Sequence, residues 1–118
     1  MSIYDTDVID FIAIQGNKVS LVLTDHLEWT DNNQEDKEHI QLLQSKINKY
    51  IAFYESGEIF VKKPEAKDKY IAIEIVAKYC LNKIGAEFIS FIRNYLANSN
   101  CNKLGLEFIW ADDRKINN

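Results

Sequence analysis

Residues 8–24 read VIDFIAIQGNKVSLVLT, and this stretch decides the fold because a turn separates two apolar segments. Gly16 and Asn17 form the turn, and both residue types tolerate the positive φ angles that tight hairpin turns require. The flanking segments, Val8–Ile14 and Val19–Thr24, are therefore predicted to be the two strands of a β-hairpin.

Two hairpin registers are compatible with this turn. A loop of two residues pairs Gln15 with Lys18, and it turns the apolar residues Ile12 and Ile14 towards Leu21. A loop of three residues shifts the pairing by one position, and every side chain of the first strand then changes face. The sequence leaves the choice between these registers open.

A long helix is predicted after the hairpin. Asp31 or Asn32 can cap its start, with Gln34 or Glu35 completing a capping box. Acidic residues follow where the helix dipole favours negative charge, namely Glu35, Asp36 and Glu38. Apolar residues recur at spacings of three and four on one face, namely Ile40, Leu43, Ile47, Tyr50, Ile51 and Tyr54. Gly57 is suited to end the helix in a left-handed conformation.

The second half of the chain predicts a strand, a helix and a strand. The strand Tyr70–Tyr79 alternates, with Ile71, Ile73, Ile75 and Ala77 on one face. A helix from about Ile84 to Ala97 follows, with one apolar side formed by Ile84, Phe88, Phe91, Ile92 and Tyr95. The last strand is Leu104–Trp110. The short apolar run Ile59-Phe60-Val61 is interpreted as either a minor strand or a lid over the core edge.

These elements predict an α+β fold, a two-layer sandwich in which a four-stranded mixed sheet (ββαβαβ) has two helices on one face. The reason is that consecutive strand–helix–strand connections are right-handed and place their helices on the same side. Residues 1–118 are expected to form a single domain, with 111–118 as a frayed tail. Parallel pairing of the last two strands would separate Cys80 from Cys101 by roughly 20 Å, which is too far for a disulfide.

Composition narrows the classes of function. The 118 residues carry a formal net charge of −4 with scattered Lys and Arg, so no nucleic-acid partner is expected. No apolar run approaches the ~20 residues that span a bilayer, and the start of the chain lacks the pattern of a signal peptide. The expectation is a cytoplasmic protein with reduced thiols and no membrane partner. The four glycines are dispersed, so no phosphate-binding loop is present and no cofactor is expected.

The segment Asp25-His26-Leu27-Glu28-Trp29 is the strongest candidate for a chemical site. It follows a strand, where loops of α/β sheets often hold ligands. Asp25, His26 and Glu28 are weak candidates for acid–base catalysis, and His26 together with His39 is a weak candidate for metal binding. The structural alternative is that Asp25 and His26 bond to the loop and the helix start, while Leu27 and Trp29 close the edge of the core.

The sheet face opposite the helices is the second candidate. Several large apolar residues are expected there among charged ones, and the candidate interface residues are Val22, Glu74, Val76, Glu107 and Ile109. The hairpin register decides whether Asp10 joins Glu74 and Glu107 on this face as a carboxylate cluster or points into the core opposite Leu23. A buried Asp10 would need a polar partner.

Much of the chain is similar to a known family. The residues that carry the resemblance are Ile9–Ile14, Leu21–Trp29, His39–Tyr50 and Glu55–Gly57. They look like a family of short, uncharacterised bacterial proteins that has an Asp-His-Leu-x-Trp element between an N-terminal hairpin and a helix. The resemblance is firmest over the first half, and it implies bacterial origin and a shared single-domain fold, with no assigned activity.

Two functions follow as hypotheses. The preferred one is a non-catalytic protein-interaction module, either a homodimer or a binder of another bacterial protein, by analogy with immunity proteins that neutralise basic toxins. The alternative is a small-molecule or metal-dependent enzyme that uses the region of Asp25, His26, Glu28 and His39.

Overall fold

The computed structural model describes residues 3, 9, 11–98 and 104–110. Along the chain the elements are β1 (Phe11–Gln15), β2 (Lys18–Asp25), α1 (Asn33–Glu55), α2 (Glu58–Lys62), the 3-10 helix η1 (Pro64–Ala66), β3 (Tyr70–Ala77), α3 (Lys83–Asn98) and β4 (Leu104–Trp110). The four strands form one sheet in the order β1-β2-β3-β4. The predicted frayed tail, Asp10 and Cys101 lie outside the described residues.

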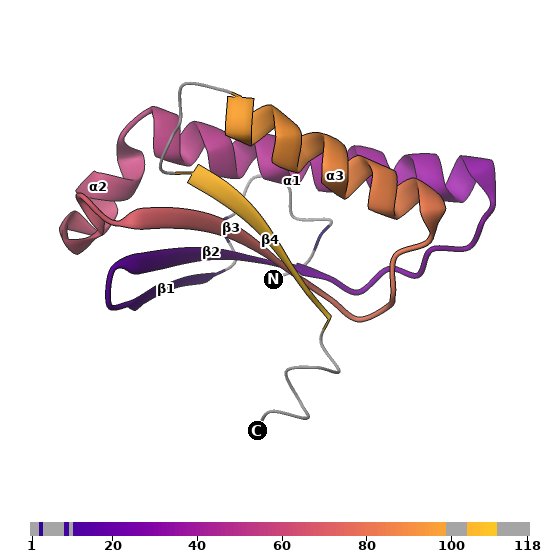
Figure 1. Ribbon diagram of the computed structural model, residues 1–118, viewed down its shortest axis with the longest axis horizontal. Helices are drawn as coiled ribbons and strands as arrows, with labels where there is room; N and C mark the ends of the chain where they lie inside the picture. Colours follow the sequence, from indigo (N-terminus) through magenta and orange to yellow (C-terminus); the bar gives the residue numbers. More distant parts are fainter. Residues whose placement is uncertain (1–2, 4–8, 10, 99–103, 111–118) are drawn as a thin grey trace.

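The mixed sheet confirms the predicted topology. β1 and β2 are antiparallel, while β2 with β3 and β3 with β4 are parallel. Both long helices, α1 and α3, lie on the same side of the sheet in Figure 1. This follows from two right-handed crossovers in succession.

The hairpin has the two-residue loop, which settles the register. Gln15 pairs with Lys18, and Gly16 adopts a φ of 57°. Ile12 consequently lies opposite Leu21, on the side of the sheet that faces the helices. The described strand begins at Phe11, later than the predicted Val8.

The core lies between the sheet and the helices. Alternate residues of β2 and β3 face it and are buried, namely Val19, Leu21, Leu23, Ile71, Ile73 and Ile75. The helix α1 contributes Leu43, Ile47, Tyr50 and Phe53. The hydroxyl group of Tyr50 donates a 2.7 Å hydrogen bond to the carbonyl oxygen of Val22, so the helix is also attached to the sheet by a buried polar contact.

Two predictions about the helices were wrong in part. Ile59-Phe60-Val61 is in the short helix α2 and forms no strand, although buried Ile59 does close the end of the core. On α3, Phe91 and Tyr95 are more than half exposed, and the buried residues are Gly85, Ile89, Ile92 and Leu96. The apolar residues of α3 are distributed over more than one face of the helix. Their spacing alone therefore did not identify the face that packs on the sheet.

Candidate functional site

The corner between β2 and α1 brings several buried polar side chains together. The chain leaves the sheet at Asp25, whose neighbour across the parallel pair is Ala77 of β3. It then follows an irregular path through residues 26–32 to the start of α1. At that start Asn32 is the N-cap, and its side chain accepts a 3.0 Å hydrogen bond from the backbone N–H of Glu35. The predicted cap is therefore confirmed.

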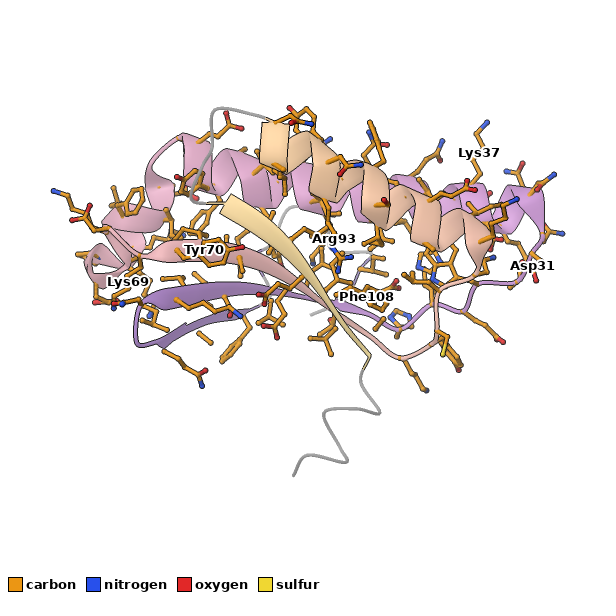
Figure 2. The ribbon with its side chains drawn as sticks, in the orientation of Figure 1. Asp31, Lys37, Lys69, Tyr70, Arg93 and Phe108 are labelled. Carbon is orange, nitrogen blue, oxygen red and sulfur yellow. The ribbon has the colours of Figure 1, made fainter. Side chains whose placement is uncertain are left out.

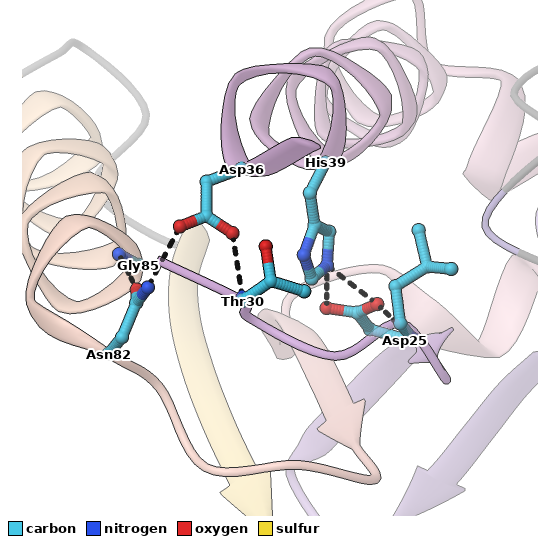
Figure 3. Close-up of polar contacts among 7 residues, drawn as sticks. Asp25, Thr30, Asp36, His39, Asn82 and Gly85 are labelled. Atoms are coloured by element: carbon cyan, nitrogen blue, oxygen red, sulfur yellow. Dashed lines mark hydrogen bonds and ion pairs between the residues drawn. The ribbon is translucent and has the colours of Figure 1, made fainter. Parts of the chain in front are cut away.

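Asp25 and His39 form a buried pair at this corner. His39 Nε2 lies 2.9 Å and 2.7 Å from the two carboxylate oxygens of Asp25, and both residues are at most 3% exposed. Since a carboxylate only accepts, the ring N–H on Nε2 is the donor. Asp25 also accepts a 3.1 Å bond from the backbone N–H of Leu27. Figure 3 shows Asp25 and His39 facing one another.

Trp29 covers the other side of this pair. Its ring stacks on the His39 ring with centroids 3.8 Å apart and an interplanar angle of 24°. Trp29 is itself covered by α3, because a Cβ atom added to Gly85 would lie 2.9 Å from the indole ring. Trp29 is thus a core residue, and its indole requires a glycine at position 85. Within the described part of the chain, His39 Nδ1 and Trp29 Nε1 are buried and have no hydrogen-bond partner.

Asp36 organises the rest of the corner. Its carboxylate accepts 3.0 Å bonds from the backbone N–H groups of Thr30 and Asp31 and from the side chain of Asn82. Asn82 in turn accepts a bond from the backbone N–H of Gly85, which connects the start of α3 to the start of α1. The predicted reciprocal capping residue was Gln34 or Glu35, but the side chain that reaches back is Asp36.

These contacts alter the acidity of Asp36. The hydrogen bond from Thr30 is the largest cause that lowers the pKa of Asp36, burial opposes it, and the bonds from Asn82 and Asp31 add to the lowering. A lowered pKa in the folded state means that the ionised carboxylate stabilises the fold. That contribution is complete above the ordinary pKa of Asp and is lost as the pH falls through the lower folded value.

The other residues of the predicted site are arranged differently from the expected cluster. His26 is exposed, while His39 is buried against Asp25, so the metal hypothesis based on these two histidines gains no geometric support. No group of three or more metal-binding side chains occurs among residues 3, 9, 11–98 and 104–110. Glu28 is exposed and lines a pocket of about 340 Å³ beside His39.

The open face of the sheet carries the second predicted site. By register, the candidate interface residues Val22, Glu74 and Glu107 form one row across β2, β3 and β4, and Val76 lies in the next row. Val22 and Glu74 are less than 9% exposed, so neighbouring side chains already cover them within one chain. The side chain of Ile109 and the whole of Asp10 lie outside the described residues, and of the three carboxylates in the predicted cluster the structure describes Glu74 and Glu107.

Lys18, at the start of β2, neutralises these carboxylates. Its ammonium group bonds to Glu107 across the sheet, and this hydrogen bond is the largest cause that raises the pKa of Lys18. The charge of Glu74 acts in the same direction. The two carboxylates therefore share one cation, and this explains how both are accommodated on adjacent strands.

Two aromatic residues of the open face are exposed. Phe11 on the edge strand β1 is 56% exposed, and Tyr70 at the start of β3 is 42% exposed. The Tyr70 hydroxyl lies where a Cβ of Gly105 would be, so its ring extends across β3 towards β4. Figure 2 labels Tyr70, and it also shows that the helices leave this side of the sheet uncovered.

The sequence pointed to Asp25 and His39 but missed Asp36, Asn82 and Gly85. Asp36 was assigned only to the favourable dipole at the helix start, and its separation from Asn82 by 46 residues hides their contact in the sequence. Lys18 was likewise missed, because its partner Glu107 is 89 residues away. A local pattern gives no information about contacts over such distances.

Comparisons with known proteins show which family the chain belongs to. Among the residues that the structure describes, no helix combines the length and the apolar character that crossing a membrane requires. Neither the curated proteins nor the solved structures give a match to this chain. Residues 1–110 match the model of the Family of unknown function (DUF6572), and the chain therefore belongs to that family.

Proposed function

We propose that this protein is a protein-interaction module, and that it associates with a second copy of itself through the open face of its sheet. The observation that carries the proposal is the one-sided sheet: α1 and α3 cover one face, while the other presents Phe11 and Tyr70 to solvent. Exposed aromatic side chains such as these two are of the kind enriched at protein interfaces.

The charges of the open face favour association over solvation. Lys18 bonds to Glu107 and also feels the charge of Glu74, so one cation offsets part of the negative charge that the two carboxylates bring to the face. The whole chain carries −4, and two copies repel one another over most of their surface. A face whose charges are partly offset in this way is where two copies can meet with the least repulsion.

The size of the face predicts a weak dimer. Four strands about 4.8 Å apart, with a rise of about 3.3 Å per residue, give a flat area of roughly 400 Å². Stable complexes bury about 800 Å² on each partner. The expected association is therefore reversible and depends on protein concentration.

Sedimentation equilibrium over about three orders of magnitude in protein concentration tests the proposal. Wild type is expected to shift from monomer to dimer as the concentration rises, and Phe11→Asp is expected to remain monomeric. Phe91→Asp is a matched control, because Phe91 is 57% exposed but lies on α3, on the opposite layer. A wild type that is monomeric throughout, or a dimer that Phe91→Asp disrupts and Phe11→Asp does not, would contradict the proposal.

The catalytic alternative has less support from the geometry. Asp25 and His39 are buried against each other under Trp29, which is the arrangement of a structural pair, and exposed His26 is not part of it. The pocket beside His39 is consistent with binding of a small group.

A further inference from the structure

The pocket beside His39 is independent of the open face. Its volume is about 340 Å³, and residues of the β2–α1 loop and of the first turns of α1 line it, namely Leu27, Glu28, Thr30, Glu35, Glu38, His39 and Leu42. This pocket is large enough for one small organic group. Its walls combine two leucine side chains with three carboxylates.

The charge of the pocket has one sign. Glu28, Glu35 and Glu38 line it, and its lining includes no lysine or arginine. Acidic residues are also favoured at a helix start by the dipole, so the carboxylates by themselves do not define a binding site. They favour a cation and disfavour an anion, which would meet three like charges.

His39 supplies an independent reason to expect a ligand. The ring is 3% exposed and forms part of the pocket wall, and Nδ1 has no hydrogen-bond partner within the described part of the chain. In the tautomer that carries its N–H on Nε2, facing Asp25, Nδ1 has a lone pair and lacks a donor. Buried acceptors without a donor are uncommon in folded proteins and destabilise them.

We infer that this pocket binds a primary alkylammonium group. The ammonium N–H groups would supply the donor that Nδ1 lacks, the three glutamates would offset the positive charge, and the alkyl chain would contact Leu27 and Leu42. Nδ1 has almost no exposed surface, so binding requires a small outward shift of the loop side chains that line the pocket, namely Leu27, Glu28 and Thr30, while Trp29 stays stacked on His39. Such a group occurs in free amines and in lysine side chains of other proteins.

NMR titration of protein labelled with ¹⁵N tests the inference. The probes are n-butylammonium for the free amine, the peptide acetyl-Gly-Lys-Gly-amide for a lysine side chain, and butyrate as an anion of matched length. Saturable binding of n-butylammonium is expected, with a displaced His39 Nδ1 resonance, and butyrate should not bind. Binding of the peptide as well would identify lysine side chains as a source, whereas its absence would assign the site to free amines.

Variants connect the binding to the pocket. Glu38→Gln is expected to weaken n-butylammonium binding about fivefold, because it removes one of the neighbouring carboxylates. Glu87→Gln is the matched control, since Glu87 is an exposed residue of α3 and does not line the pocket. Equal weakening by both variants, unsaturable titration or equal binding of butyrate would overturn the inference. Repeating the n-butylammonium titration with Phe11→Asp, which is expected to remain monomeric, shows whether binding at the pocket is independent of the proposed dimer.

Discussion

The β2–α1 corner and the open face of the sheet both contain ionised side chains, but they use them differently. At the corner, Asp25 and Asp36 are almost fully buried, and each accepts two or more hydrogen bonds. On the open face, Lys18 and Glu107 form one ion pair in which both side chains are more than a third exposed. Buried charges require defined partners and therefore fix geometry, whereas an exposed pair contributes little free energy.

The largest expected effect comes from removing one partner of the buried pair. Asp25→Ala should lower the free energy of unfolding by about 3 kcal/mol or more, because the Nε2–H of buried His39 and the backbone N–H of Leu27 would both lose their acceptor. Urea denaturation followed by circular dichroism measures this change. Glu107→Ala, which breaks the exposed pair, should cost at most about 1 kcal/mol. If Asp25→Ala and Glu107→Ala lowered the free energy of unfolding by similar amounts, the proposed difference between the β2–α1 corner and the open face would be contradicted.

Two glycines give a sharper form of the same comparison. A Cβ at Gly85 would meet the buried indole of Trp29 at 2.9 Å, so Gly85→Ala should cost about 1–3 kcal/mol. A Cβ at Gly105 would overlap the Tyr70 hydroxyl, but that side chain is 42% exposed and can rotate away. Gly105→Ala should therefore stay within about 0.5 kcal/mol of wild type. Thermal unfolding of both variants tests this order. A larger destabilisation by Gly105→Ala than by Gly85→Ala would contradict it.

A further expected effect depends on pH. Asp36→Asn should destabilise the fold near neutral pH, because the amide removes the charge that Thr30, Asp31 and Asn82 stabilise. The pKa of Asp36 is lowered in the folded state, so the difference between wild type and variant should shrink as the pH falls below the ordinary pKa of Asp. Unfolding free energies measured at a series of pH values test this. A difference that stays constant into acid would show that the charge of Asp36 has no role.

The sequence predicted the features that depend on local patterns. Gly16-Asn17 identified the hairpin, and the alternation of Ile71, Ile73 and Ile75 identified the core face of β3. It did not decide the hairpin register, which depends on the loop length. The prediction of which face of α3 packs on the sheet was partly wrong, because the exposed residues Phe91 and Tyr95 fit the same spacing as the buried ones.

The candidate site was predicted only in part. The sequence left undecided whether His39 approaches His26, and the structure pairs His39 with Asp25. Side chains of consecutive residues in an extended segment point to opposite sides, so only one of Asp25 and His26 can face the helix. Which one does so follows from the register of β2 against β3, and that is a property of the whole sheet.

The stacking of Trp29 on His39 has an optical consequence. The indole is the fluorescent group of this corner, and its ring centroid lies 3.8 Å from that of the His39 imidazole. The fluorescence of Trp29 should therefore respond to any proton, ligand or substitution that changes His39. The molecule thus contains an intrinsic reporter beside His39, and no dye has to be attached to follow changes there.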